Sequence, residues 1–160
     1  MITIISYSQD KIVTHRGDTI TCNIIELADK MIRYKLVGED SLKRIPKSLT
    51  KEIIFENGIA QEVTDKIIIN GIADWKKVQM TTSKSDIEGL VRYGEIIAKS
   101  NSTWSTTDIN KMEDKATDRI RKTAAKNGCH IILITDSTTG DYGDFEDGSN
   151  ASITGIAYKY

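Results

Sequence analysis

The sequence predicts an α+β protein in which a small N-terminal β unit precedes a domain with one helix packed on a sheet. Three observations lead to this prediction. Apolar residues recur at helical spacing between Asn101 and Gly128. Before Gly58, the chain consists of short segments in which apolar and polar residues alternate, a pattern typical of half-buried strands. Apolar segments of strand length lie on both sides of the helical segment.

The size and charge of the chain limit the classes of function. A chain of 160 residues can bury one sizeable core or form two small domains. Its 22 basic and 23 acidic residues give a net charge of −1, so no basic excess is present to neutralise a run of phosphates. We therefore expect no nucleic-acid partner. We also expect no membrane span, because the apolar runs are too short to cross a bilayer.

The first residues resemble the end of a secretory signal peptide. Residues 1–5 are mostly apolar, and small residues follow at Ser6 and Ser8. This pattern predicts that residues 1–9 are a signal-peptide remnant and that the protein is exported to the periplasm or cell envelope. The alternative is a short first strand or a disordered end, with a cytoplasmic protein if Met1 is the true start.

Residues 10–60 are predicted to form an all-β unit. Its single proline, Pro46, suits a strand end, and Lys47–Thr50 suits a tight helical turn. Five short strands with a helical turn before the last are the order of a small SH3-like barrel. The expected strands are Lys11–Thr14, Thr19–Leu27, Met31–Val37, Leu42–Ile45 and Glu52–Glu56.

A connecting segment is expected at residues 61–74. The run Ile67–Ile69 is too apolar for a flexible linker, and Asn70-Gly71 is typical of a turn. We therefore expect a strand here that crosses between the two halves or packs between them.

Residues 75–160 are predicted to form a β-β-α-β-β domain. Gly94 lies inside the second expected strand, where glycine is typical of a bulge or a close backbone approach. One helix between the strand pairs would cover one face of a single sheet. The expected strands are Trp75–Thr82, Leu90–Lys99, Cys129–Ile134 and Ser152–Tyr160.

The helix has recognisable ends and one apolar stripe. Ser105 followed by Asp108 is typical of a capping box, and Asn127-Gly128 predicts a left-handed stop. Between these ends, apolar residues recur at steps of three and four, which predicts one buried face. The residues of this stripe are Ile109, Met112, Ala116, Ile120 and Ala124.

The sequence contains two cysteines and two histidines, and they do not form a recognisable site. Cys22 and Cys129 fall in different predicted domains, so two buried thiols are favoured over a disulfide. On the expected strand, Cys129 would be buried and His130 half-exposed on opposite faces, so the pair cannot easily chelate one ion. His15 falls in the other domain. We therefore expect no catalytic residues and a protein that is not an enzyme, with a hydrolase as a weaker reading.

An acidic, glycine-containing segment, Ser137–Asn150, is the best candidate for a metal site. Calcium prefers clustered oxygen ligands on a bendable backbone. The spacing does not match an EF-hand loop, and the alternative is a solvated loop between two strands. The candidate ligands are Asp141, Asp144, Glu146 and Asp147, and apart from this calcium no cofactor is expected.

Small and apolar motifs between Trp75 and Tyr160 resemble those of the YbjQ/RcsF type of domain. That resemblance implies the two-strand, helix, two-strand order. YbjQ-like proteins form rings and have been labelled heavy-metal binders, whereas RcsF is a lipid-anchored stress sensor of the cell envelope. The paired cysteines of RcsF have no counterpart here. The motifs are Glu88-Gly89-Leu90, Tyr93–Ile97, Lys115-Ala116, Ala124-Ala125, Asn127-Gly128, Ile131–Ile134 and Ser152–Ala157.

The N-terminal half resembles a segment of exported Bacteroides-type proteins that has no established activity. It shares a Gly17-Asp18 turn, a tyrosine strand at Ile32–Lys35, an Ile45-Pro46-Lys47 step and a terminal Glu56–Gly58. This resemblance favours export.

Taken together, these patterns predict an exported, non-enzymatic protein of the cell envelope. We expect it to bind a protein partner or to self-associate, with exposed sheet edges as contact surfaces. The alternative is a metal- or small-ligand-binding protein that uses the acidic segment 136–150.

Overall fold

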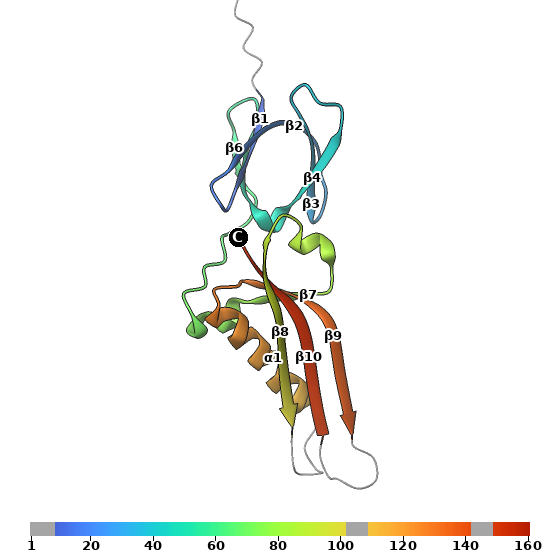
Figure 1. The fold of residues 1–160 in the computed structure, drawn as a ribbon. Coiled ribbons are helices and arrows are strands. Elements are labelled where there is room, and N and C mark those ends of the chain that lie inside the picture. Colours follow the sequence, from blue (N-terminus) through green and yellow to red (C-terminus); the bar gives the residue numbers. More distant parts are fainter. Residues whose placement is uncertain (1–8, 102–108, 142–148) are drawn as a thin grey trace, which may run out of the picture. The chain divides into compact units, whose positions relative to one another are not determined.

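The computed structural model (Figure 1) describes residues 9–101, 109–141 and 149–160. The chain is an α+β protein with two sheets. It separates into two compact units, Met1–Lys66 together with Tyr160, and Ile67–Lys159. We refer to them as unit 1 and unit 2. The predicted domain limits, 10–60 and 75–160, stay predictions.

Unit 1 contains a six-stranded antiparallel sheet in the order β4-β3-β2-β1-β5-β6. A 3-10 helix, η1 (Lys47–Leu49), joins β4 to β5, where the sequence predicts a helical turn. The sheet is strongly curved (Figure 1). The strands are β1 (Asp10–Thr14), β2 (Thr19–Leu27), β3 (Met31–Leu36), β4 (Leu42–Pro46), β5 (Thr50–Ile54) and β6 (Ala60–Glu62).

The five predicted strands of unit 1 are confirmed, with shifts at their ends, and β6 is an addition. β6 pairs with β5 through Ile54 and Ala60, so the chain after Gly58 forms a hairpin. Within the described strands, β4 and β6 are the two edges of the sheet, and backbone pairing does not close it into a barrel.

The interior of unit 1 comes from alternate residues of its strands. Ile12, Cys22, Ile32 and Ile53 are all buried, and each lies on a different strand. At the start of β1, the Asp10 carboxylate accepts hydrogen bonds from the backbone N–H groups of Ile24 (2.9 Å) and Glu56 (3.0 Å). The Asp10 side chain therefore links β1 to β2 and to the turn that follows β5.

Unit 2 contains a four-stranded sheet in the order β7-β9-β10-β8. The pairs β9–β10 and β10–β8 are antiparallel, and β7 runs parallel to β9. The predicted β-β-α-β-β order is confirmed. The elements are η2 (Ile72–Lys77), β7 (Gln79–Thr81), η3 (Lys84–Ile87), β8 (Val91–Asn101), α1 (Ile109–Lys126), β9 (Ile131–Asp141) and β10 (Ser149–Lys159).

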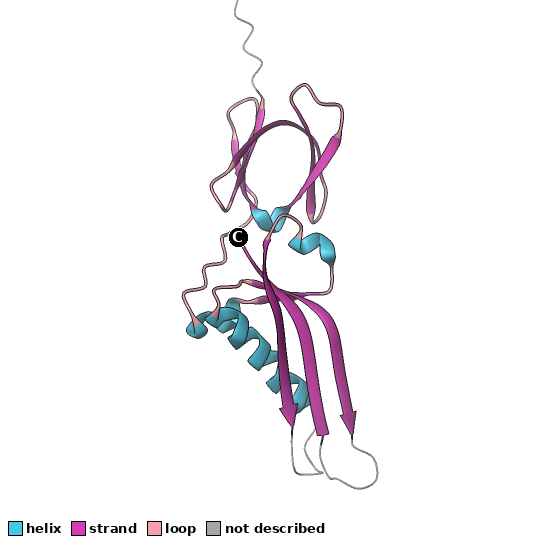
Figure 2. Cartoon of the chain, viewed as in Figure 1, coloured by secondary structure: helices cyan, strands magenta, loops and turns pink. Residues whose placement is uncertain are grey.

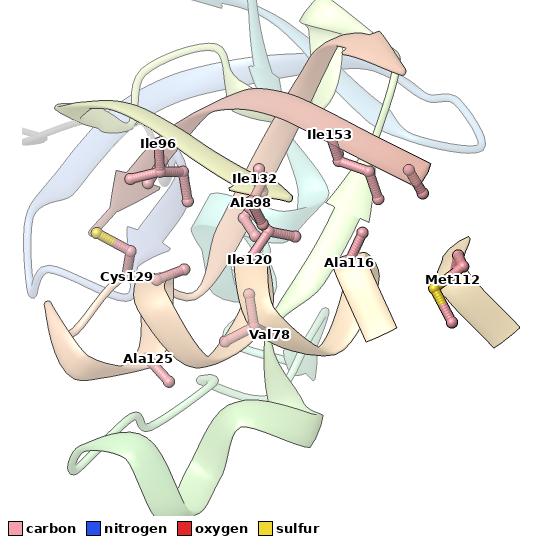
Figure 3. Close-up of a cluster of buried hydrophobic side chains, with 13 residues drawn as sticks. Val78, Ile96, Ala98, Met112, Ala116, Ile120, Ala125, Cys129, Ile132 and Ile153 are labelled. Carbon is pink, nitrogen blue, oxygen red and sulfur yellow. The ribbon is translucent and has the colours of Figure 1, made fainter. Parts of the chain in front are cut away.

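The helix α1 covers one face of this sheet and lies over β8, β10 and β9 (Figures 1 and 2). The predicted apolar stripe faces the sheet, and Met112, Ala116, Ile120 and Ala124 are fully buried. They belong to one buried cluster with Ile96, Ala98, Ile132 and Ile153 from the strands, and Figure 3 shows Ala116 and Ile120 on the side of the helix that faces the strands. The side chain of Ile109 and the expected capping box at Ser105 and Asp108 lie outside the described residues.

The C-terminal end of α1 is the left-handed stop that the sequence predicts at Asn127-Gly128. Gly128 adopts φ 68°, in the left-handed region that glycine enters without strain. The N–H of Cys129 donates to the Ala124 carbonyl, and the N–H of Gly128 donates to that of Ala125, both at 3.0 Å. This pair of bonds is a Schellman motif, which satisfies two carbonyls at the end of α1.

One prediction about the start of unit 2 is wrong, and another is right only in part. Residues 67–69 belong to none of the described strands; Ile69 packs on the core of unit 2, whereas Ile68 is exposed. The predicted strand Trp75–Thr82 is a 3-10 helix up to Lys77 and a strand only at Gln79–Thr81. An ion pair between Asp74 and Lys77 at 2.7 Å, three residues apart, stabilises this turn.

The limits of β9 and β10 also differ from prediction. The strand expected at Cys129 begins at Ile131, and the described ends of the expected loop 137–150 are strand, up to Asp141 and again from Ser149. Thr139 pairs with Ala151, and Ser137 pairs with Ile153, so a long antiparallel ladder holds these polar residues extended. Backbone pairing overrides their loop-like composition.

We predict that Gly155→Ala destabilises unit 2 whereas Gly94→Ala has little effect. A methyl group at Gly155 would lie 2.6 Å from Ile132 Cγ2 and 2.9 Å from the Leu133 carbonyl oxygen, whereas one at Gly94 meets nothing within 4 Å. Overpacking of this kind costs about 1–3 kcal/mol. Urea denaturation, followed by tryptophan fluorescence, measures the free energy of unfolding of each variant relative to the wild type. Equal stabilities for the two variants would contradict the packing described for β10.

Candidate functional site

The predicted calcium ligands fall mainly outside the described residues. Asp141 is the last residue of β9, where its backbone pairs with Ser149. Asp144, Glu146 and Asp147 belong to the range 142–148, which the structure does not describe. Within residues 9–101, 109–141 and 149–160, no group of three or more His, Cys, Asp or Glu side chains could hold a metal ion. The calcium site stays a prediction.

The two cysteines are buried free thiols, as predicted, and they belong to different units. Burial raises the pKa of the Cys22 thiol to about 11, with a further contribution from the Asp10 carboxylate. Burial also raises the pKa of Cys129, and nearby Lys159 opposes this shift. Because the thiolate is the reactive form, both side chains are weak nucleophiles at neutral pH.

His130 does not lie half-exposed on a strand, as predicted, but is buried just before β9. Its backbone N–H donates to the Tyr158 carbonyl at 3.1 Å, and its carbonyl accepts from the N–H of Gln79 at 2.9 Å. The backbone of His130 therefore joins β7 and β10 at the point where β9 begins.

His15 is held inside unit 1 by a hydrogen-bonded threonine. Its Nε2 lies 2.9 Å from Thr64 Oγ1, which also lies 2.8 Å from the Thr50 carbonyl and 3.0 Å from the Lys47 carbonyl. Because the one hydroxyl proton of Thr64 goes to a carbonyl, the His15 ring donates to Thr64 through an Nε2–H group. This arrangement joins the end of β1 to the residues that surround β5.

The electrostatic surroundings of His15 favour its neutral form. Burial lowers the pKa of His15 below 6.5, and Lys66 and Lys51 lower it further, whereas Asp65 opposes them. A charged imidazole here would lose solvation and would lie near two lysines. The geometry and the charges therefore give His15 a structural role.

The sheet edges, which the sequence predicts as contact surfaces in general terms, differ in length. In unit 1, β4 has five residues and β6 has three. In unit 2, β7 has three residues and pairs with β9 only at Ile131–Leu133, so the rest of β9, up to Asp141, also lies at an edge of the described sheet, whereas the edge strand β8 has eleven residues. Among the described strands, β8 therefore presents the longest unpaired row of backbone groups.

The two faces of β8 have different neighbours. Ile96, Ala98 and Ser100 face α1 and are buried. Glu95, Ile97 and Lys99 alternate with them on the opposite face and are exposed, and Ile97 keeps 54 % of its surface accessible. Ile97 lies opposite Thr154 of β10. We call residues 95–99 the β8 edge.

The first residues of β8 depart from the regular ladder. Gly94 pairs with Ala157, but the next pair joins Arg92 to Tyr158, so Tyr93 is the extra residue of a bulge. This irregularity lies next to Gly94, as the sequence predicts. The Tyr93 hydroxyl donates to Asn127 Oδ1 at 2.8 Å and thereby attaches the bulge to the end of α1.

The β8 edge itself is regular. Residues 95–99 pair with β10 without a shift of register. At one end of the segment, the Arg119 guanidinium donates to the Lys99 carbonyl. The edge therefore combines an extended backbone, one exposed isoleucine and one charge of each sign.

Comparison of the chain with protein-family models, curated proteins and solved structures finds no match. The resemblance to the YbjQ/RcsF type of domain and the resemblance to exported Bacteroides-type proteins therefore stay predictions. In the described part of the chain, no helix is both long and apolar enough to cross a membrane.

We predict that acid weakens unit 1 through His15. The lowered pKa means that the unfolded chain binds a proton more readily than the folded unit. The contribution of neutral His15 to stability is therefore complete above pH 6.5 and is lost as the pH falls through 6.5 towards the folded-state pKa. Urea denaturation, followed by NMR signals of unit 1, measures the free energy of unfolding of this unit at each pH.

His15→Gln is the matched control, because glutamine keeps an N–H donor and does not titrate. The difference in stability between the wild type and this variant should fall as the pH is lowered from 7.5 to 5. A difference that stays constant, or that grows with acid, would contradict the burial of a neutral histidine.

Proposed function

We propose that this chain is a non-catalytic protein-interaction module that associates by adding a strand at the β8 edge. In strand addition, main-chain hydrogen bonds supply affinity and alternate side chains supply specificity. One observation carries the proposal: an eleven-residue edge strand exposes 54 % of Ile97 between Glu95 and Lys99.

The surroundings of the other reactive residues support an interaction role over a catalytic one. The His15 imidazole is engaged with Thr64, and burial raises the pKa of both thiols. In contrast, the side chains of Glu95, Ile97 and Lys99 are exposed and presented on a rigid element.

We further propose that unit 1 is an SH3-like β-barrel and that unit 2 is a domain of the YbjQ/RcsF type. The strand order β4-β3-β2-β1-β5 and the 3-10 turn before β5 support the first proposal. The β-β-α-β-β order supports the second. Export to the cell envelope is part of the same proposal and is supported by the signal-like N-terminal residues.

Site-specific photocrosslinking in the cells that make the protein tests the interaction. A benzophenone amino acid in place of Ile97 should give a crosslinked protein adduct on irradiation, because a partner strand would lie against this side chain. The matched control is the same substitution at Glu113, which is exposed on α1. The mass of the adduct shows whether the partner is another protein or a second copy.

An adduct yield at position 97 that does not exceed the yield at position 113 would contradict the proposed function. The substituted proteins should keep the melting temperature of the wild type, because both side chains are exposed.

A further inference from the structure

The charges of the β8 edge are arranged symmetrically about Ile97. Glu95 precedes it by two residues and Lys99 follows it by two residues, and all three side chains lie on the face of the sheet that α1 does not cover. Thus an acidic side chain and a basic side chain lie at equal distances on either side of one exposed apolar residue.

Such a segment can pair with a copy of itself. When two copies of one edge strand pair antiparallel, a two-fold axis relates them, and residue i of one copy lies opposite residue j of the other. Residues opposite each other must also lie on the same face of the joined sheet. Because side chains alternate between faces, residues i and j must be an even number of positions apart. The two-fold axis therefore passes beside the single residue of β8 that lies midway between them.

This rule leaves few registers for the β8 edge. An axis beside Glu95 or Lys99 places two like charges opposite each other, which destabilises a sheet. An axis beside Ile96 places Ile97 opposite Glu95, and an axis beside Ala98 places Ile97 opposite Lys99. Only an axis beside Ile97 places Glu95 of each copy opposite Lys99 of the other.

We propose that the partner at the β8 edge is a second copy of this chain, paired antiparallel about Ile97. The proposal rests on the proposed function and specifies its partner. Each Glu95 faces the Lys99 of the other copy, and the two Ile97 side chains meet and shield each other from water. On the other face, Ile96 lies opposite Ala98, so both helices lie on the same side of one continuous sheet.

The backbone of the two edges supplies the remaining contacts. Pairing satisfies main-chain N–H and C=O groups that face solvent in the single copy. The Lys99 carbonyl already accepts a hydrogen bond from Arg119, so we assign no new bond to it. The charge pairs set the register, because exposed pairs of this kind contribute little affinity by themselves.

Charge reversal at the β8 edge tests the pairing in the purified full chain. Sedimentation equilibrium should show a concentration-dependent dimer for the wild type. Glu95→Lys places lysine opposite Lys99, and Lys99→Glu places glutamate opposite Glu95, so each variant alone should dimerise about tenfold or more weakly. An equimolar mixture of the two variants should form a heterodimer, because both opposite-charge pairs are restored.

The double variant Glu95→Lys/Lys99→Glu should also regain the dimer. Matched controls are Glu113→Lys and Lys115→Glu, which make the same changes of net charge at exposed positions of α1 and should leave the dimer unchanged. Circular dichroism and melting temperature establish that all variants fold.

Two results would overturn the proposal: a wild type that stays monomeric at every concentration, or single variants that dimerise as tightly as the wild type. A monomeric wild type that still crosslinks a different protein through position 97 would refute self-pairing and leave the proposed function standing. Failure of both experiments would refute the proposed function itself.

Discussion

The contact between α1 and one face of the four-stranded sheet determines the rest of unit 2. Fully buried side chains of the helix, Met112 and Ile120 among them, meet the inward-facing residues of β8, β9 and β10. On the strand next to β8, Gly155 leaves no room even for a methyl group, so β9 and β10 pack closely beneath the helix. An 18-residue helix can cover only one face, and the opposite face must be stabilised otherwise.

Among the described residues, a buried cluster covers one end of the opposite face. There Ile131, Leu133 and Tyr158 form a small buried cluster, and Ile87 and Leu90 from the segment around η3 pack against it. Ile97 lies on the same face but outside this cluster and stays exposed. Among the described residues, the position of this cluster and the order of the strands therefore leave Ile97 exposed on an edge strand.

Local sequence patterns predict the helix and strands whose structure depends mainly on their own side chains. The helix follows from a regular apolar stripe and from the Asn127-Gly128 stop, and the strands of unit 1 follow from strict alternation. Long-range pairing produced the differences. The polar residues 137–141 are extended because β10 pairs with them, whereas the apolar run 67–69 belongs to none of the described strands.

For the β8 edge, too, local sequence patterns do not show which strands pair with each other. The sequence predicts the strand around Ile96 and the irregularity at Gly94, but it does not contain the strand order that leaves β8 at an edge. Glu95, Ile97 and Lys99 occupy alternate positions, which places them on one face of a strand. Whether that face is exposed depends on which side of the sheet α1 covers, and the sequence patterns do not show this.

Hydrogen exchange of the β8 amides, measured by NMR at low and high protein concentration, tests the central claim most directly. In dilute protein, the amides of residues 95–99 should alternate between slow exchange, where they pair with β10, and fast exchange at the open edge. At high concentration, the fast amides should become protected. Fast amides that remain unprotected, or uniform protection in dilute protein, would contradict an edge strand that pairs with a second chain.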